Sequence, residues 1–376
     1  MNSKVIGSAL LIAGTCIGAV MIVIPITLLP LGSFGVFAML VISQLLMAYS
    51  GILIFEVAAT FPKGTDLAAM ASAIIGPWAG SLVNMLFSLL LYCLLASYLT
   101  GGSALLAESG PWHNWGIGFW AVLGVLFLML SMRAQDWLNR LFMLLLVVSF
   151  IAFVGGASQH LRLVNITSVP FTSFWPSIAV LATAFGYHVI IPSLRDYLDN
   201  DIGLYKQTLF LGLSVPLVLY VVWCFSLYGL LPYHGEFGLL HLSQMSNAFI
   251  HIQDYLSQLL ASRLIPISMF IFMLTSILSS YVGIALSLMQ AVSNKFKINV
   301  GFRSMVVILP PAVFAILMPG SFLLTLKYAA LIVAIISLFL PVVMVVRSQL
   351  NLTLARKLSL AIIVLYGFAV FYSAIA

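Results

Sequence analysis

Charged residues are scarce in this sequence. Asp, Glu, Lys and Arg make up 6% of its 376 residues, whereas hydrophobic residues make up 63%. Soluble domains carry about a quarter charged residues, so a soluble globule is excluded and the solvent must be lipid. The apolar runs suit membrane helices of about 20 residues and exceed the roughly ten residues of a barrel strand. The sequence therefore predicts an all-α integral membrane protein within a lipid bilayer.

Cysteines and catalytic motifs are equally rare. Cys16, Cys93 and Cys224 lie in apolar stretches without CxxC spacing, which indicates neither a disulfide framework nor a zinc site. The chain contains no GxxxxGK(S/T) loop and no HExxH or GxSxG motif, which disfavours an ATP-driven pump and a membrane hydrolase. We expect no cofactor, no metal site and no enzymatic activity. An intramembrane enzyme remains a distant alternative function for this protein, and a channel is a third possible function.

The net charge of +6 is spread over single basic residues between apolar runs, so no nucleic-acid partner is expected. An N-terminus in the cytoplasm leaves only Arg162, Arg263 and Lys327, of fifteen lysines and arginines, on the outer side. This bias predicts a cytoplasmic N-terminus and a periplasmic C-terminus. The apolar run from Lys4 continues to Pro30, which favours a first span over a cleaved signal. Eleven spans are predicted, at 5–29, 33–60, 77–107, 116–133, 137–157, 174–190, 205–230, 263–290, 302–318, 321–347 and 355–375.

The longest stretch between spans, residues 231–262, alternates polar and apolar residues at helical spacing. It predicts short amphipathic helices that lie on the outer face. His234, His241 and His251 within it form either a three-histidine metal site or solvated loop histidines.

Two spans are interrupted by glycine near their middle. The first contains Gly14 to Ala19, and the sixth contains Ala184 to His188 followed by Pro192. Backbone groups freed at this depth must face a cavity, a ligand or an ion. Half-helix ends offer amide N–H groups to a carboxylate and carbonyls to a cation. The alternative is that Gly14 and Gly18, spaced GxxxG, only allow close helix packing.

The positions of the interruptions suggest an internal repeat. Spans one to five (about 5–157) and six to ten (about 174–347) each begin with a broken helix, and 355–375 is an extra helix. Five spans per half give the halves opposite orientations, as in inverted-repeat transporters. We therefore predict one transporter domain over residues 1–376.

Few ionisable groups lie within spans, and such groups are functional candidates. His188 at the second interruption titrates near neutral pH when unperturbed, and Glu56 ends the second span. The hydroxyls of Thr275, Ser276 and Ser279, with Ser280, share one face of the eighth span. They either complete a cation site at the first interruption or bond carbonyls of their own helix.

Charges of both signs follow the broken sixth span. Arg195, Asp196 and Asp199 lie there on the predicted cytoplasmic side. They form either an inner gate that opens for release or an ordinary solvated loop.

Several segments together resemble the bacterial hydroxy and aromatic amino acid permease family. They are Gly14 to Ala19 with Pro25, Phe185 to His188 with Pro192-Ser193, Leu309-Pro310-Pro311, Glu56-Val57, Tyr92, Tyr98 and Asn139-Arg140. The resemblance implies a leucine-transporter type 5+5 inverted repeat plus one C-terminal helix. It also implies a multi-pass protein of the bacterial inner membrane that imports an aromatic amino acid by ion symport.

The same resemblance implies a substrate site at both interruptions, with Tyr92 beside the aromatic ring. Its residues would be Gly14, Thr15, Cys16, Ile17, Gly18, Ala19, Tyr92, Phe185, Gly186, Tyr187 and His188. Tyrosine is the first substrate choice, with tryptophan, phenylalanine and serine as alternatives. Protons are the preferred coupling ion and sodium is the alternative. Two departures weaken proton coupling, because Leu146 and Gln290 stand where titratable residues are expected.

Overall fold

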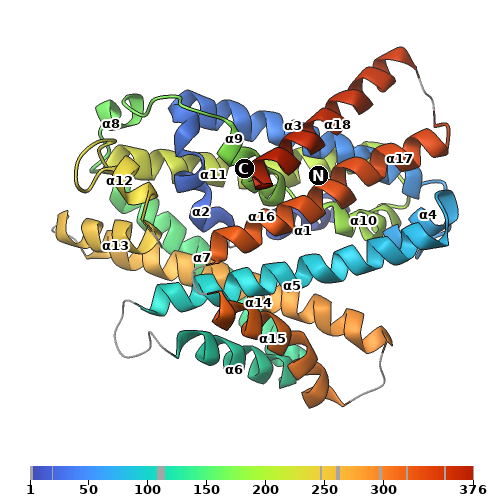
Figure 1. Ribbon diagram of the computed structural model, residues 1–376, viewed down its shortest axis with the longest axis horizontal. Coiled ribbons are helices and arrows are strands. Elements are labelled where there is room, and N and C mark those ends of the chain that lie inside the picture. The colour runs from blue at the N-terminus through green and yellow to red at the C-terminus, as the bar shows by residue number, and fades with distance from the viewer. Residues whose placement is uncertain are drawn as a thin grey trace.

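The structure is a computed structural model that describes residues 3–18, 20–107, 115–245, 248–259, 263–295, 299–318, 321–350 and 353–375. Helices are the only regular elements in these ranges (Figure 1). The first half contains α1 (Ser3–Cys16), α2 (Val20–Thr27), η1 (Leu29–Leu31), α3 (Gly32–Ala58), α4 (Leu67–Ile74), α5 (Pro77–Ala107), α6 (Gly116–Met129) and α7 (Met132–Ser158). Next come α8 (Leu163–Thr167), α9 (Trp175–Ala184), η2 (His188–Ile190), α10 (Ile191–Tyr197), α11 (Ile202–Leu230), α12 (Leu239–Ser243) and α13 (Ala248–Leu259). The chain continues with α14 (Leu264–Lys295), α15 (Val300–Leu317), α16 (Phe322–Ala334), η3 (Ile335–Phe339), α17 (Leu340–Arg347) and α18 (Leu354–Ile375).

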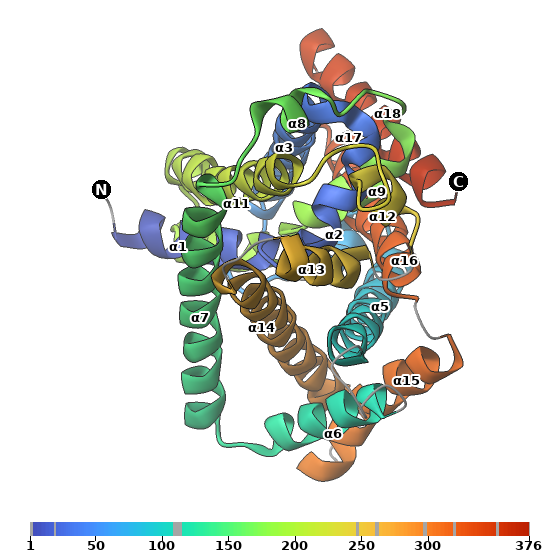
Figure 2. The same ribbon diagram turned by 90° about the vertical axis from the view of Figure 1, so that its left-hand side faces the viewer.

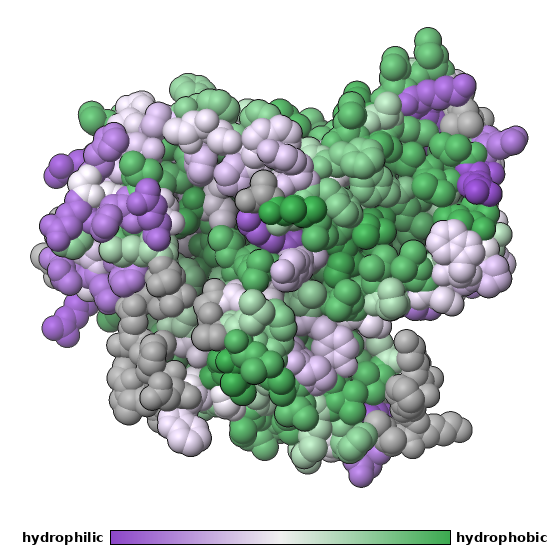
Figure 3. Space-filling view, in the orientation of Figure 1, coloured by the Kyte–Doolittle hydropathy of each residue, from purple (hydrophilic) through white to green (hydrophobic). Residues whose placement is uncertain are grey.

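These helices make up the eleven predicted spans. Nine helical stretches in the described residues are long and apolar enough to cross a bilayer, and α1 and α6 are shorter apolar helices. Together α1 and α2 form the first span, and α9 with α10 forms the sixth. Figure 3 shows hydrophobic residues over the middle of one face and hydrophilic residues gathered toward its two ends. The predicted all-α membrane fold is therefore confirmed.

Four helices begin at a polar cap. The side chains of Asp66, Ser131, Asp201 and Asn299 accept backbone N–H groups at the starts of α4, α7, α11 and α15. The first N–H groups of a helix have no partner within the helix, so a capping side chain stabilises each of these ends. All four caps fall in loops that the charge bias assigns to the cytoplasmic side.

The bundle is built from helices that are distant in sequence. The long helix α14 packs along α7, and α5 packs along α16. The fourth and ninth spans, α6 and α15, pack on each other beside them. Figure 2 shows α5, α14 and α7 around one side of the molecule, with α1 reaching outward to the N-terminus. Helix α1 packs on α11, and α9 packs against α16 and α18.

The tenth span contains a local π-helix, η3 (Ile335–Phe339), between α16 and α17. A π turn widens the helix and changes its carbonyl pairing. The Ser50 hydroxyl of α3 donates a hydrogen bond to the Ser337 carbonyl within this turn. A side chain of the second span therefore stabilises the irregular segment of the tenth.

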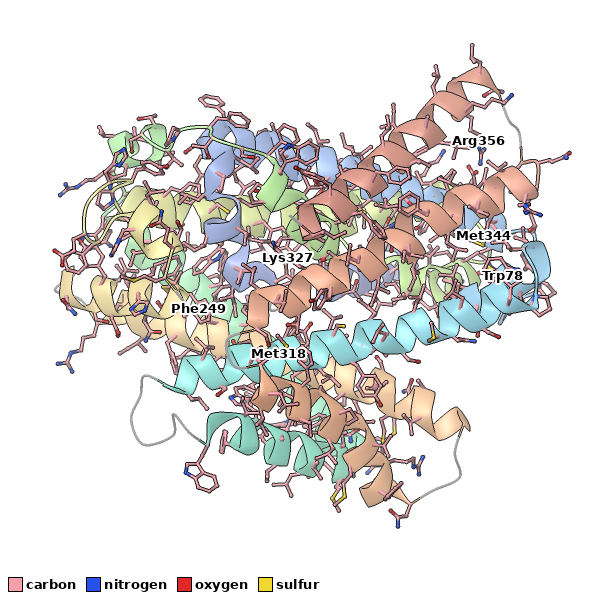
Figure 4. All side chains as sticks on the ribbon, viewed as in Figure 1. Trp78, Phe249, Met318, Lys327, Met344 and Arg356 are labelled. Atoms are coloured by element: carbon pink, nitrogen blue, oxygen red, sulfur yellow. The ribbon has the colours of Figure 1, made fainter. Side chains whose placement is uncertain are left out.

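Helix α18 is fastened to α3 by an ion pair. The Arg356 Nη2 atom lies 2.5 Å from Glu56 Oε2, and both side chains are partly buried. Figure 4 places Arg356 at the same end of the molecule as Met344 and Trp78. The sequence made Glu56 a candidate for ion coupling, but the structure pairs it with a fixed cation away from both interruptions.

The segment between spans seven and eight forms the short helices α12 and α13, as the amphipathic pattern predicts. His234, His241 and His251 do not gather there into a metal-binding group in the described part of the chain. The three-histidine alternative is therefore not supported.

Candidate functional site

Both predicted interruptions are present. Helix α1 ends at Cys16 and α2 begins at Val20, with Ile17 and Gly18 in irregular backbone. Ala19 lies outside the described residues. Helix α9 ends at Ala184, and the 3₁₀ turn η2 leads into α10. Each span is thus a pair of half-helices whose ends meet inside the bundle.

The hydroxyl of Tyr220 in α11 joins the two interruptions. It lies 2.6 Å from the Cys16 carbonyl oxygen and 3.2 Å from the Ala184 carbonyl oxygen. These carbonyls belong to the last residues of α1 and α9, where helical hydrogen bonding ceases. The Tyr220 side chain is fully buried, and its ring meets Phe185 edge-on with centroids 5.7 Å apart. One phenol therefore serves both half-helix ends.

Gly18 lies against the eighth and third spans. The Ser276 hydroxyl donates to the Gly18 carbonyl at 3.1 Å, and Met21 N–H donates to the same carbonyl at 2.9 Å. A methyl group on Gly18 would lie 2.9 Å from Ser280 Oγ and 4.0 Å from the Tyr98 hydroxyl. The Tyr98 hydroxyl and the Ser280 side chain therefore both lie beside Gly18. Gly18 is thus required for this close approach.

Only Ser276 of the three hydroxyl candidates reaches the first interruption. Thr275 donates to the Ile271 carbonyl at 2.7 Å, one helical turn back. Ser279 likewise bonds the carbonyl of Ser276 at 3.3 Å. Thr275 and Ser279 therefore bond carbonyls of their own helix, and Ser276 contacts the first interruption.

The residues of the second interruption pack mainly against α3. The Tyr187 hydroxyl lies 3.3 Å and His188 Nε2 lies 3.1 Å from the Met47 carbonyl oxygen. A carbonyl only accepts, so His188 carries its proton on Nε2. Its Nδ1 atom is buried without a hydrogen-bond partner in the described residues. Gly186 is partly buried between these contacts.

Three predicted site residues make no contact across the interruptions in the described part of the chain. The Tyr92 hydroxyl donates to the Val306 carbonyl of α15 at 3.0 Å. Thr15 donates to the Ile12 carbonyl of its own helix at 2.7 Å. Gly14 is exposed, and nothing lies within 4 Å of a methyl group placed on it. Sequence reasoning gave no role to Tyr98 or Tyr220, because which tyrosine faces an interruption depends on helix rotation and packing.

The charged residues at the end of α10 connect three segments. The Arg195 guanidinium, which is 2% exposed, donates to the Phe61 and Pro62 carbonyls at 3.2 and 3.0 Å. Asp196 accepts the Gly64 N–H at 2.7 Å. Both contacts hold the end of α10 against the loop after α3.

Asp199 extends this connection to the first span. Its φ of 53° is a left-handed conformation that Asp tolerates, and it turns the chain toward α11. The carboxylate oxygens lie 2.5 Å from Lys4 Nζ and 3.0 Å from Lys63 Nζ. We call Lys4, Lys63, Arg195, Asp196 and Asp199 the charged latch.

The charged latch is expected to be insensitive to pH in the working range. Hydrogen bonds from Lys4 and Lys63 lower the pKa of Asp199 to about 2, from 3.8. A lowered pKa stabilises the folded state above pH 3.8, and that contribution is lost only as the pH falls through about 2. Asp199→Asn should therefore change transport by a constant factor, roughly two- to fivefold for an exposed ion pair, between pH 5 and pH 8.

The measurement is initial uptake at four pH values in this window. Asp136→Asn is the matched control, because Asp136 pairs with Arg140 within α7 and connects no second element. A ratio of wild-type to Asp199→Asn uptake that varies with pH contradicts the assignment.

The sequence matches the tryptophan/tyrosine permease family over residues 1–367. Two tyrosine-specific transport systems of Haemophilus influenzae are 25% and 28% identical, over 92% and 93% of this chain and 89% of each relative. A glutamine transporter of Aliivibrio fischeri is 27% identical over 92% of this chain and 89% of its own length.

Two solved structures share the fold. The manganese transporter of Eremococcus coleocola has a TM-score of 0.57 and 11% identity, over 97% of this chain and 85% of that one. MhsT in complex with L-phenylalanine has a TM-score of 0.53 and 14% identity, over 98% of both chains. Both are leucine-transporter folds, as the resemblance implies. The fold and the match over nearly the whole sequence lead to one conclusion: this chain is a multi-pass permease and belongs to the tryptophan/tyrosine permease family.

Proposed function

We propose that this protein is a secondary active symporter that imports an aromatic amino acid, with tyrosine as the first choice, by alternating access. The observation that carries the proposal is the meeting of two half-helix ends at Tyr220. Unwound ends inside a bundle present amide and carbonyl groups that suit both charges of a zwitterion. Relatives named as tyrosine transport systems support an aromatic substrate. Tryptophan, phenylalanine and serine are alternatives, and the glutamine transporter among the relatives makes glutamine a required competitor.

The substrate groups have assignable partners in this proposal. The α-carboxylate lies near the start of α2, where free N–H groups favour an anion, and near the Tyr98 and Ser280 hydroxyls. The aromatic ring packs beside Phe185, whose ring already contacts Tyr220. Tyr98 replaces Tyr92 as the third-span residue of the site, because its hydroxyl is the one beside Gly18.

Protons are the proposed coupling ion. A carbonyl oxygen has two lone pairs. The Gly18 carbonyl already accepts Ser276 and Met21, and the Cys16 carbonyl accepts Tyr220, which leaves these oxygens little capacity for a sodium ion. His188 Nδ1 is the proposed proton acceptor, since it is buried near the second interruption without a partner in the described residues. Sodium is the second candidate, because Ser276 and Ser280 place hydroxyl oxygens beside Gly18.

The proposal includes an orientation, a repeat and a gate. The charge bias favours a cytoplasmic N-terminus and a periplasmic C-terminus. The α14–α7 and α5–α16 contacts are the equivalent pairs, spans eight and five and spans three and ten, that two halves at 5–157 and 174–347 would form. The charged latch is the proposed inner gate, because it joins α1, α10 and the loop after α3.

The deciding experiment is uptake of radiolabelled tyrosine into proteoliposomes. We expect accumulation under an inward proton gradient without sodium, and none after a protonophore is added. Unlabelled phenylalanine, tryptophan, serine and glutamine are then added in turn as competitors.

Uptake that requires sodium and does not depend on the proton gradient would show that sodium is the coupling ion, and symport would still hold. Equilibration without accumulation under either gradient would reject symport in favour of a channel. Accumulation of labelled glutamine in a parallel assay, without accumulation of tyrosine, would reject the aromatic substrate.

A further inference from the structure

A cavity of about 410 Å³ opens between the third, sixth, eighth and tenth spans. One end of the cavity reaches Asp66, which caps α4 in the loop after α3. The other end, within the bundle, reaches Val189 in η2 and Ile336 in η3. These two residues belong to irregular helical segments, and Val189 directly follows His188 of the second interruption. The cavity thus runs from the loop side of the molecule to the residue that follows the second interruption.

Two long helices supply much of the cavity wall. Helices α5 and α14 pack on each other, and both contribute lining residues, as does the start of α4. Asp66 at that start belongs to the side that the charge bias assigns to the cytoplasm. The cavity therefore lies between α5, α14 and the irregular segments of the sixth and tenth spans, with one end on that side.

The lining offers amide groups beside an apolar wall. Ser88 and Ser287 bond carbonyls of their own helices at 2.9 Å each. The amides of Asn84 and Gln290, from α5 and α14, supply both donors and acceptors to the space. Phe87 lies on the same wall as Asn84 and adds an apolar face. A volume above 300 Å³ with convergent polar groups on an apolar lining is typical of a small-molecule site.

We propose that this cavity is a second amino-acid site, which the substrate occupies on its way to the cytoplasm, with Asn84 and Gln290 as its polar contacts. The amides bind the carboxylate and ammonium groups without a fixed charge that would retain them, and Phe87 contacts the side chain. This inference rests on the proposed function, because it takes the transported amino acid as the ligand.

The test is chemical labelling of Asn84→Cys and Gln290→Cys in sealed membrane vesicles with a membrane-impermeant methanethiosulfonate reagent. We expect both cysteines to react in inside-out vesicles and to stay unreacted in right-side-out vesicles. L-Tyrosine at ten times its half-saturating concentration should slow the reaction roughly tenfold, because it leaves about a tenth of the sites free.

Met85→Cys is the matched control. Met85 follows Asn84 in α5, is 58% exposed and does not line the cavity. A cysteine there would face the lipid, and we expect no reaction from either side. The unsubstituted chain supplies the background, since Cys16 and Cys224 are buried and Cys93 is partly buried.

Tyrosine uptake measured in the same vesicles separates this inference from the proposed function. Labelling that tyrosine does not slow, in vesicles that accumulate tyrosine, overturns the second site and leaves the symporter intact. Slowed labelling in vesicles without gradient-driven uptake supports the site and rejects symport. Labelling from the outside overturns the cytoplasmic position of the cavity.

Discussion

Tyr220→Phe is expected to lower tyrosine uptake roughly ten- to a hundredfold, because an unsatisfied buried polar group costs about 1–3 kcal/mol. The substitution keeps the ring that packs on Phe185 and removes the hydroxyl oxygen that contacts both the Cys16 and Ala184 carbonyls. Those carbonyls end α1 and α9, so their loss of a donor alters both interruptions at once. The measurement is the initial rate and half-saturation of uptake in proteoliposomes.

Tyr228→Phe is the control for general destabilisation. Tyr228 lies in the same helix, is also fully buried, and donates to the Pro25 carbonyl of α2 at 2.6 Å. Both variants lose one buried phenol hydroxyl, so their thermal unfolding in detergent should shift by similar amounts. Only Tyr220→Phe should lose far more transport activity than its shift in thermal unfolding explains. Equal losses of transport in the two variants would reduce Tyr220 to a packing residue.

The sequence predicted the membrane fold closely, because lipid imposes long apolar helices. The predicted spans 77–107 and 355–375 correspond to α5 (Pro77–Ala107) and α18 (Leu354–Ile375). The sixth span was wrong at its end, since 174–190 stops short of α10 (Ile191–Tyr197). Pro192 suggested a helix end, but it stands in the first turn of α10. A backbone N–H group at that position has no partner within the helix, so proline is tolerated there.

The side chains of the site were less predictable than the interruptions. Tyr92 and Tyr98 are six residues apart, so at about 100° per residue they face directions about 120° apart on α5. Only one of them can face Gly18, and the sequence does not say which. The contact from Tyr220 to Cys16 spans 204 residues of sequence, and no local pattern encodes such a contact. His188 was predictable as a polar residue at an interruption, but not its bond to the Met47 carbonyl.

Gly18→Ala is the second substitution expected to have a large effect, a loss of at least about tenfold in uptake. The new methyl group would lie 2.9 Å from Ser280 Oγ. This distance is shorter than a van der Waals contact between a carbon and an oxygen atom. The Ser280 side chain or the interruption must then move, which disturbs the hydrogen bond from Ser276 to the Gly18 carbonyl. A net loss of about 1 kcal/mol for one hydrogen bond, added to the displacement of the interruption, gives this magnitude.

Ser280→Ala supplies the rescue and Gly14→Ala supplies the control. The double variant Gly18→Ala with Ser280→Ala removes the oxygen that the methyl group meets, so it should transport better than Gly18→Ala alone. Gly14 lies in the same broken span with open space around it, and alanine there should leave uptake unchanged and strengthen α1 by up to about 1 kcal/mol. Because a GxxxG helix contact would require both glycines, equal damage from Gly14→Ala and Gly18→Ala would favour that contact. A double variant no better than Gly18→Ala would remove Ser280 from the explanation.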